Sequence, residues 1–182
     1  MSEELMVRHC SPTLAGLKTG SIFTCPDRGE RENREAIRQM NRALVKKGLR
    51  VLPLRIHRGR VLIYVYRPAH LKEDLRHGTA CRLLKERGYE CENPDTCVLH
   101  LIRRLTENEE FPHEIGLFLG YPPEDVCGFI EKRDDCKCVG CWKVYGDEAE
   151  ARRRFAQYDK CTQIYEEELR RGANVEQLAI SC

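Results

Sequence analysis

Two adjacent runs of β-branched and aromatic residues constrain the fold of this chain more than any other feature. Residues 49–56 have the sequence LRVLPLRI and residues 60–66 have RVLIYVY, with His57-Arg58-Gly59 between them. Runs of this composition favour strands, and a short connection that contains glycine joins two strands into a hairpin. The pattern therefore predicts an antiparallel hairpin over 49–66, with Pro53 at an edge or a bulge.

Amphipathic helices are predicted on both sides of this hairpin. They are a short helix from Ser11-Pro12 toward Phe23, a helix over 32–47, a stretch from Pro68 interrupted at Gly78, a helix from Asn93-Pro94 to TENEE, two short helices within 111–130, a long helix after Asp147, and a last one capped by Asn174 and Gln177. No repeat or linker divides the sequence. We therefore expect one α+β domain over residues 1–182, with a small, mostly antiparallel sheet packed by several amphipathic helices.

The cysteine content and the start of the chain predict a reducing compartment. The chain has 11 cysteines, an odd number, and its N-terminus MSEELMVRHC has acids where a signal peptide needs basic residues and an apolar stretch. No apolar run approaches the roughly 18 to 20 residues that cross a bilayer. These features predict a cytoplasmic protein without membrane contact and with reduced thiols.

Charge is unevenly distributed along the sequence although the total is only +2. Residues 28–60 carry eleven Arg or Lys against three Glu, a local balance of +8, and residues 107–135 carry nine acids against Lys132 and Arg133, or −7. Two electrically distinct faces are suited to docking a protein partner. The arginine-rich window could bind phosphates and stack bases on Tyr64 and Tyr66, but a pI near 8.0 argues against a dedicated nucleic-acid binder.

A C-x-C-x-x-C motif is formed by Cys136, Cys138 and Cys141, and Gly140 would let its backbone fold three sulfurs toward one point. Thiolates at such spacing bind zinc or iron-sulfur clusters. A fourth ligand would come from Cys127, Cys161, Cys10, His113 or His9. The alternative is that the three cysteines pack as small hydrophobic residues beside Trp142.

A second candidate site is the predicted helix entry at Cys10, where the helix dipole would lower the pKa of the thiol. The thiolate could then act as a nucleophile, assisted by Lys18 or His113. The alternative is a buried, inert cysteine.

A third candidate is His113-Glu114 at a helix start, with His113 as general base or ligand and Glu114 favouring the positive end of the dipole. The alternative there is a structural cap.

Four strings of the sequence resemble a bacterial protein family named domain of unknown function 3793. They are HCSPTLAGLKTGSIF, LIYVYRP, FPHEIGLFLGYPPEDVCGFI and GCWKVYGD, and the resemblance covers nearly the whole chain. It implies a stand-alone bacterial protein and carries over no activity, cofactor or catalytic residue. It directs attention to the residues inside the strings, namely His9, Cys10, Lys18, His113, Glu114, Cys138, Trp142, Lys143 and Tyr145.

Taken together, these patterns favour a small metal- or redox-linked protein that binds zinc or an iron centre through its C-terminal cysteines. Two alternatives stay open. One is a thiol-dependent enzyme that uses Cys10, and the other is a non-catalytic interaction protein. Whether the chain is an enzyme is not decided by the sequence.

Overall fold

The structure is a computed structural model that describes residues 2–76, 78–107 and 110–181. The chain divides into two compact units. Unit 1 comprises Met1–Ala69 and Lys160–Cys182, and unit 2 comprises His70–Asp159. The predicted single domain is not tested by this division and stays a prediction. Each unit is described by itself below.

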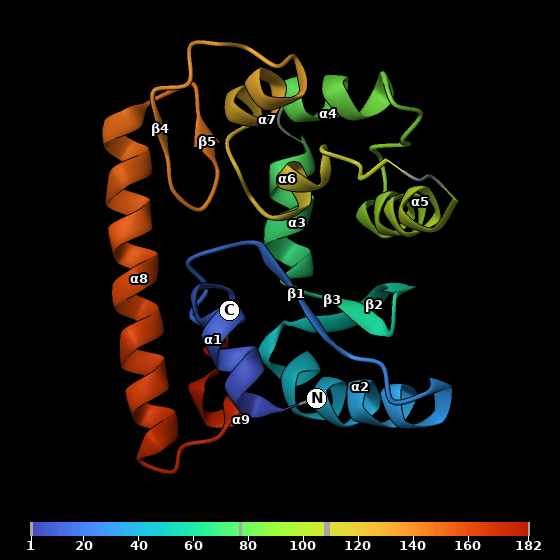
Figure 1. Ribbon diagram of the computed structural model, residues 1–182, viewed down its shortest axis with the longest axis vertical. Coiled ribbons are helices and arrows are strands. Elements are labelled where there is room, and N and C mark those ends of the chain that lie inside the picture. Colours follow the sequence, from blue (N-terminus) through green and yellow to red (C-terminus); the bar gives the residue numbers. More distant parts are fainter. Residues whose placement is uncertain (1, 77, 108–109, 182) are drawn as a thin grey trace. The chain divides into compact units, whose positions relative to one another are not determined.

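The elements follow the predicted α+β composition, and the fold class is confirmed (Figure 1). Unit 1 contains α1 (Glu3–Leu14), β1 (Gly20–Pro26), α2 (Glu30–Leu44), the 3₁₀ turn η1 (Val45–Lys47), β2 (Arg50–His57), β3 (Arg60–Tyr66) and α9 (Val175–Leu178). Unit 2 contains α4 (Gly78–Lys85), α5 (Pro94–Glu107), α6 (Ile115–Phe118), α7 (Pro123–Ile130), β4 (Cys138–Val139) and β5 (Lys143–Val144). The helices α3 (Pro68–Arg76) and α8 (Glu148–Arg170) each continue from one unit into the other.

The sheet of unit 1 has three antiparallel strands in the order β1-β3-β2. The predicted hairpin is confirmed as β2 and β3, and the register shifts between Pro53 and Arg55, where a bulge was expected. The strand β1 was not predicted, since residues 14–23 were expected to be helical. It pairs with β3 from Gly20↔Tyr66 to Pro26↔Arg60. This pairing depends on a partner distant in sequence, so the local pattern did not indicate it.

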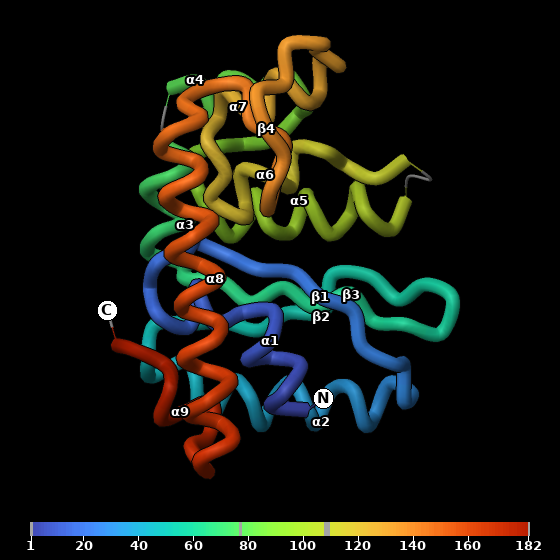
Figure 2. The backbone as a smooth tube through the Cα atoms, turned by 60° about the vertical axis from the view of Figure 1, so that its left-hand side comes forward, coloured from blue at the N-terminus to red at the C-terminus, as the bar shows by residue number. Residues whose placement is uncertain are grey.

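One face of this sheet forms the core of unit 1. Val61, Ile63 and Val65 of β3 pack with residues from α1, α2 and α9, and Figure 2 shows α1 and α2 on the same side of the three strands. The amphipathic character predicted for the helix over 32–47 is confirmed, because Leu44 is buried and Ile37 and Met40 pack against the core. The arginines of α2 lie exposed on its other side.

The first helix begins nine residues earlier than predicted, and Pro12 lies inside it. The Ser2 side chain caps α1 by accepting a hydrogen bond from the Leu5 N–H at 3.4 Å, and Glu3 and Glu4 occupy the first turn, where acids are favoured. Pro12 has no N–H to donate to the carbonyl four residues earlier, and the helix ends two residues after it. Ser11 is no cap: its hydroxyl donates to the Val7 carbonyl.

A buried arginine closes the end of α1. Arg67, which follows β3, is 1% exposed. Its guanidinium donates to the carbonyls of Thr13 at 2.8 Å, Leu14 at 2.7 Å and Ile180 at 2.8 Å. The last carbonyls of a helix lack partners within the helix, so Arg67 satisfies two of them while tying β3 to α1 and to the C-terminal segment.

Unit 2 is mainly helical, with a short hairpin formed by β4 and β5. Trp142 and Val144 of this hairpin pack against Ala151 and Tyr158 of α8, and Phe155 flanks them. The strand expected near the end of CKCVGCWKVYG and the long helix after Asp147 are both confirmed. Of the TENEE segment predicted to end α5, Asn108 and Glu109 lie outside the described residues. Within the described part of the chain, no helix has both the length and the apolar character that a bilayer crossing requires.

Candidate functional site

A broad pocket of about 700 Å³ opens on unit 2. Its lining contains five Lys or Arg against three acids, together with a histidine and three aromatic rings. The charged residues are Arg87, Arg104, Lys132, Arg133, Lys143, Glu110, Glu114 and Asp134. Ligand pockets in proteins typically have volumes of about 300–1,000 Å³, so this pocket can hold a small molecule.

Glu114 is the acid at the inner wall of the pocket, and it is only 2% exposed. One of its carboxylate oxygens lies 2.8 Å from Nε of Arg104, and the other lies 3.9 Å from Nε of Arg87. The Tyr89 hydroxyl donates a hydrogen bond to it at 2.9 Å. Burial and the neighbouring Glu114 charge raise the pKa of Tyr89, which therefore stays protonated as the donor.

His113 and Glu114 stand at a helix start as predicted, because Glu114 is the N-cap residue of α6. The helix α6 that follows has only four residues, and the Glu114 side chain makes no capping hydrogen bond to it. The carboxylate points instead to the two arginines. Paired arginines offset its charge, so the pocket keeps its positive character.

Two lysines at the pocket have no described carboxylate partner. Among the residues that the structure describes, neither Lys132 nor Lys143 forms an ion pair. Lys143, on β5, lies with Nζ 5.6 Å from the centre of the Phe129 ring. Both side chains are exposed, so their charges are available to an anion in the pocket.

The backbone at Lys132 is unusual, with φ of 55°. It follows the C-terminus of α7, and the Arg133 N–H donates to the Gly128 carbonyl at 3.1 Å. Helices commonly end in this left-handed conformation, but the residue there is usually glycine, because a side chain at positive φ is strained. Strained residues concentrate at functional sites.

Arg133, the residue after Lys132, is held by neighbouring side chains. Arg133 donates through Nε to Asp135 at 2.9 Å and forms an ion pair with it, and its guanidinium lies 5.9 Å from the Tyr145 ring centre.

His113 packs edge-on against Phe129, with ring centroids 5.0 Å apart. His113 is exposed at the pocket, so its role as a general base or ligand stays a prediction.

A smaller recess of about 190 Å³ adjoins the pocket, and His113, Phe129 and Lys143 line both. The recess has a mainly apolar lining of Ile115, Gly116, Tyr121, Val126, Phe129 and Trp142. The Tyr121 and Trp142 rings stack with centroids 4.7 Å apart.

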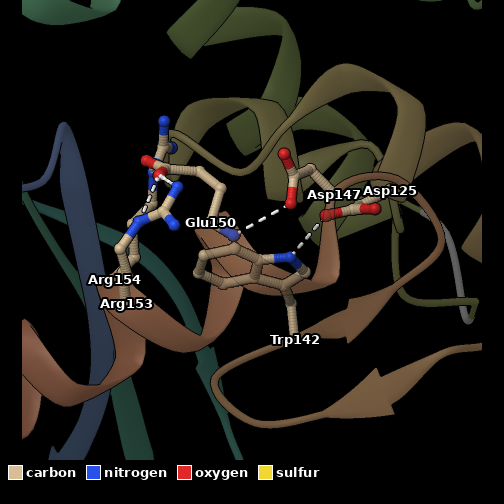
Figure 3. A network of polar contacts seen from close by, with 6 residues as sticks. All are labelled: Asp125, Trp142, Asp147, Glu150, Arg153 and Arg154. Carbon is tan, nitrogen blue, oxygen red and sulfur yellow. Dashed lines mark hydrogen bonds and ion pairs between the residues drawn. The ribbon is translucent and has the colours of Figure 1, made fainter.

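A buried carboxylate holds the hairpin that carries Trp142 and Lys143. Asp125 of α7 is 3% exposed and accepts hydrogen bonds from the Trp142 indole N–H and from the backbone N–H groups of Tyr145 and Gly146, each at 2.7 Å. Figure 3 shows the indole nitrogen directed at this carboxylate. The three donors fix the position of β5 relative to α7, and so the position of Lys143.

The three cysteines of the C-x-C-x-x-C motif have different surroundings. The Cys136 thiol donates to the Cys138 carbonyl at 3.3 Å, Cys138 packs against the cluster around Trp142, and Cys141 is exposed beside the recess. Gly140 was expected to fold these sulfurs toward one point. Its role in the structure is different, because a Cβ atom there would lie 2.3 Å from the Phe155 ring.

The predicted metal site gains no support from the described residues, in which no three His, Cys, Asp or Glu side chains are gathered to hold an ion. Among the proposed fourth ligands, Cys127 is half-buried in α7 and Cys161 is buried in α8. Burial raises the pKa of Cys161 to about 11. His9 stacks on Phe23, with centroids 5.7 Å apart. Metal ligation by this set stays a prediction.

Cys10 lies in the interior of α1, not at a helix entry. It is fully buried in the core of unit 1. Burial raises the pKa of its thiol, and the opposing effect of Lys18 is smaller. These surroundings favour the neutral thiol and oppose the expected thiolate.

Three of the remaining cysteines, Cys81, Cys91 and Cys97, lie in unit 2. Cys91 and Cys97 are buried, and Cys81 is half-buried. The Cys91 thiol donates to the Cys81 carbonyl at 3.4 Å, and burial raises the pKa of Cys91 to about 12. Cys182 lies outside the described residues.

Sequence reasoning identified part of this pocket and missed the rest. His113, Glu114, Lys143 and Tyr145 lie in the strings that carry the family resemblance, and all four line the pocket. The residues it missed are Arg87, Arg104, Lys132 and Arg133. A signal was present only for Lys132, which stands directly after an apolar helix where a glycine would end it.

Comparison with known proteins identifies a family and nothing more specific. No curated protein and no solved structure matches the chain. A family model does match, over residues 6–179, and its description is "Protein of unknown function (DUF3793)". The match spans nearly the whole sequence, so the chain belongs to the DUF3793 family.

Proposed function

We propose that this protein binds a phosphorylated small molecule in the basic pocket of unit 2. The observation that carries the proposal is the set of five Lys and Arg side chains around one hollow of about 700 Å³. Two of these cations, Lys132 and Lys143, have no ion-pair partner among the described residues. A concentration of positive charge at a concave surface attracts anions.

Phosphate fits this lining better than a single carboxylate does. Arginine presents a planar set of donors that matches phosphate oxygens, and lysine adds a compact charge. Arg104 lies with Nε 2.8 Å from Glu114, and its side chain is 31% exposed. Five cations against three acids leave an excess of two positive charges in the lining, which a dianionic group would compensate and a monoanion would not.

The pocket is a better candidate than the cysteine cluster or Cys10. The metal hypothesis depends on spacing alone, because the described residues gather no set of ligands. The thiol hypothesis requires an accessible thiolate, and Cys10 is fully buried. The pocket in contrast combines volume, charge and two residues, His113 and Lys143, that the family resemblance had already singled out.

Calorimetric titration with inorganic pyrophosphate tests the proposal. We expect binding that weakens as salt is raised, because exposed charges are screened within about 8 Å at physiological ionic strength. Lys143→Gln should weaken binding about three- to tenfold, since one partly exposed charge contact contributes about 1 kcal/mol. Lys72→Gln removes an exposed lysine of α3 away from the pocket and is the matched control.

A variant that is expected to raise the affinity for pyrophosphate makes the test more specific. Glu114→Gln keeps an acceptor for the Tyr89 hydroxyl but removes the charge that offsets Arg87 and Arg104. Pyrophosphate affinity should therefore rise about three- to tenfold, the reverse of the Lys143→Gln effect. Absence of binding to the wild type, or equal losses in Lys143→Gln and Lys72→Gln, would contradict the proposal.

A further inference from the structure

The apolar recess beside the basic pocket is not explained by phosphate binding alone. We propose, on the basis of the function proposed above, that the ligand is a small phosphate ester of a single aromatic ring. The phosphate lies among the cations and the ring occupies the recess. Continuity of the two hollows is the first argument, because His113, Phe129 and Lys143 line both of them.

The recess has walls suited to a flat ring. Tyr121 and Trp142 stack at an interplanar angle of 28°, and Phe155 meets the Trp142 ring edge-on with centroids 4.6 Å apart. Phe129 lines the side shared with the pocket. Aromatic rings attract one another beyond the effect of buried area when they stack or meet edge to face, so an aromatic guest gains more here than an aliphatic one.

These walls are held in place before a ligand arrives. The Trp142 indole donates to the buried Asp125 carboxylate at 2.7 Å, as Figure 3 shows, and the Tyr121 hydroxyl donates to the Cys141 carbonyl at 3.3 Å. Groups fixed in the binding geometry lose little entropy on association. The indole N–H and the carboxylate are also already paired with each other, so the recess interacts with a guest mainly through apolar surface.

The volume limits the size of the ring. A cavity of about 150 Å³ lined by apolar side chains holds benzene, and this recess measures about 190 Å³. One six-membered ring therefore fits the recess. The phosphate must be attached close to the ring, because Lys143 stands at the junction of recess and pocket.

Trp142 is the single tryptophan of the chain, so its fluorescence reports on the recess directly. Phenyl phosphate should change the Trp142 emission and bind about tenfold more tightly than methyl phosphate, a difference of about 1.4 kcal/mol. Inorganic phosphate, followed by calorimetry, should bind without changing the emission. Equal affinities of phenyl and methyl phosphate in the wild type would overturn the inference.

A variant at the exposed wall gives a second, independent measurement. Cys141 is exposed and lines the recess, so Cys141→Phe should fill it without disturbing the core. This variant should bind phenyl and methyl phosphate equally while keeping its affinity for inorganic phosphate, and Cys141→Ser should keep the tenfold preference. A tenfold preference that persists in Cys141→Phe would contradict occupation of the recess.

The two proposals fail in different ways. Binding of inorganic phosphate without a preference for the aryl ester would overturn the ring and leave the phosphate site in place. Absence of binding by every phosphate compound would overturn both. A phosphotyrosine peptide that binds more than tenfold more tightly than phenyl phosphate would overturn the small-molecule assignment in favour of a protein partner.

Discussion

Unit 1 and unit 2 each bury charged side chains, but they use them for different purposes. In unit 1, buried Arg67 donates to backbone carbonyls of the same unit and completes the end of a helix. In unit 2, buried Asp125 and Glu114 hold the walls of two adjoining hollows. In this protein a buried charge indicates a candidate site where its partners line an accessible space, as they do in unit 2.

The two units also distribute their surface cations differently. The +8 window of unit 1 places Arg31, Arg38 and Arg42 on the exposed side of α2. The −7 window of unit 2 contributes to a pocket with more cations than acids, because Arg87, Arg104 and Lys143 reach it from outside that window. The net charge of a sequence window therefore does not predict the charge of the pocket it helps to form.

The largest effect is expected from Arg67→Met, which tests whether the buried charge of unit 1 is purely structural. Removing the donor leaves the carbonyls of Thr13, Leu14 and Ile180 without it. A buried acceptor left without its donor costs about 1–3 kcal/mol, and three carbonyls are affected, so chemical denaturation should show a drop of about 3 kcal/mol or more in the free energy of unfolding. Arg38→Met, an exposed arginine of α2, should change stability by less than about 0.5 kcal/mol. A loss of unfolding free energy below about 1 kcal/mol for Arg67→Met would contradict the structural role of this buried arginine.

A smaller loss of stability, joined to a loss of specificity, is expected from Asp125→Asn. Asparagine presents one acceptor oxygen and an NH₂ group to three donors, those of Trp142, Tyr145 and Gly146. The free energy of unfolding should fall by about 2 kcal/mol, because hydrogen bonds to charged groups contribute about 1.5–3 kcal/mol. Trp142 is then less firmly held, so the preference for phenyl over methyl phosphate should shrink. Asp147→Asn is the control, since its side chain only caps the Glu150 N–H on the surface (Figure 3). If both variants keep the preference, Asp125 does not organise the recess.

The smallest effect is expected where each unit has a side chain at positive φ. Lys132 has φ of 55° and Arg58, in the turn between β2 and β3, has φ of 49°. Replacing either by glycine relieves the strained backbone and should raise the free energy of unfolding by up to about 1 kcal/mol. Lys132→Gly should also weaken pyrophosphate binding, whereas Arg58→Gly should leave it unchanged. Equal binding by the two variants would show that Lys132 is not part of the site.

Local patterns predicted most elements of the fold. The β2–β3 hairpin, the bulge near Pro53, the apolar positions of α2 and the last helix capped by Asn174 and Gln177 all follow from sequence periodicity and turn chemistry. The errors lie where distant segments decide the outcome. Gly20–Pro26 forms a strand by pairing with β3, and α1 starts at Glu3 with Ser2 as its cap and includes Pro12, where the local pattern placed a helix start.

The candidate site, too, depends on contacts between distant segments that local patterns do not predict. Spacing alone favoured the sulfurs of Cys136, Cys138 and Cys141, which have three different environments in the structure. Spacing could not reveal that Arg87 and Arg104 meet at Glu114, because these residues come from separate segments.

The family could be recognised from four strings of the sequence, and the α+β class from composition and local periodicity. Which cysteines are buried and which cations share a pocket became known from the tertiary structure. The net charge of a pocket and the reactivity of a thiol depend on neighbours that packing brings together from separate segments. Burial raises the pKa of the Cys10 thiol inside α1. Exposed Lys132 and Lys143 line one pocket together with residues from several separate segments.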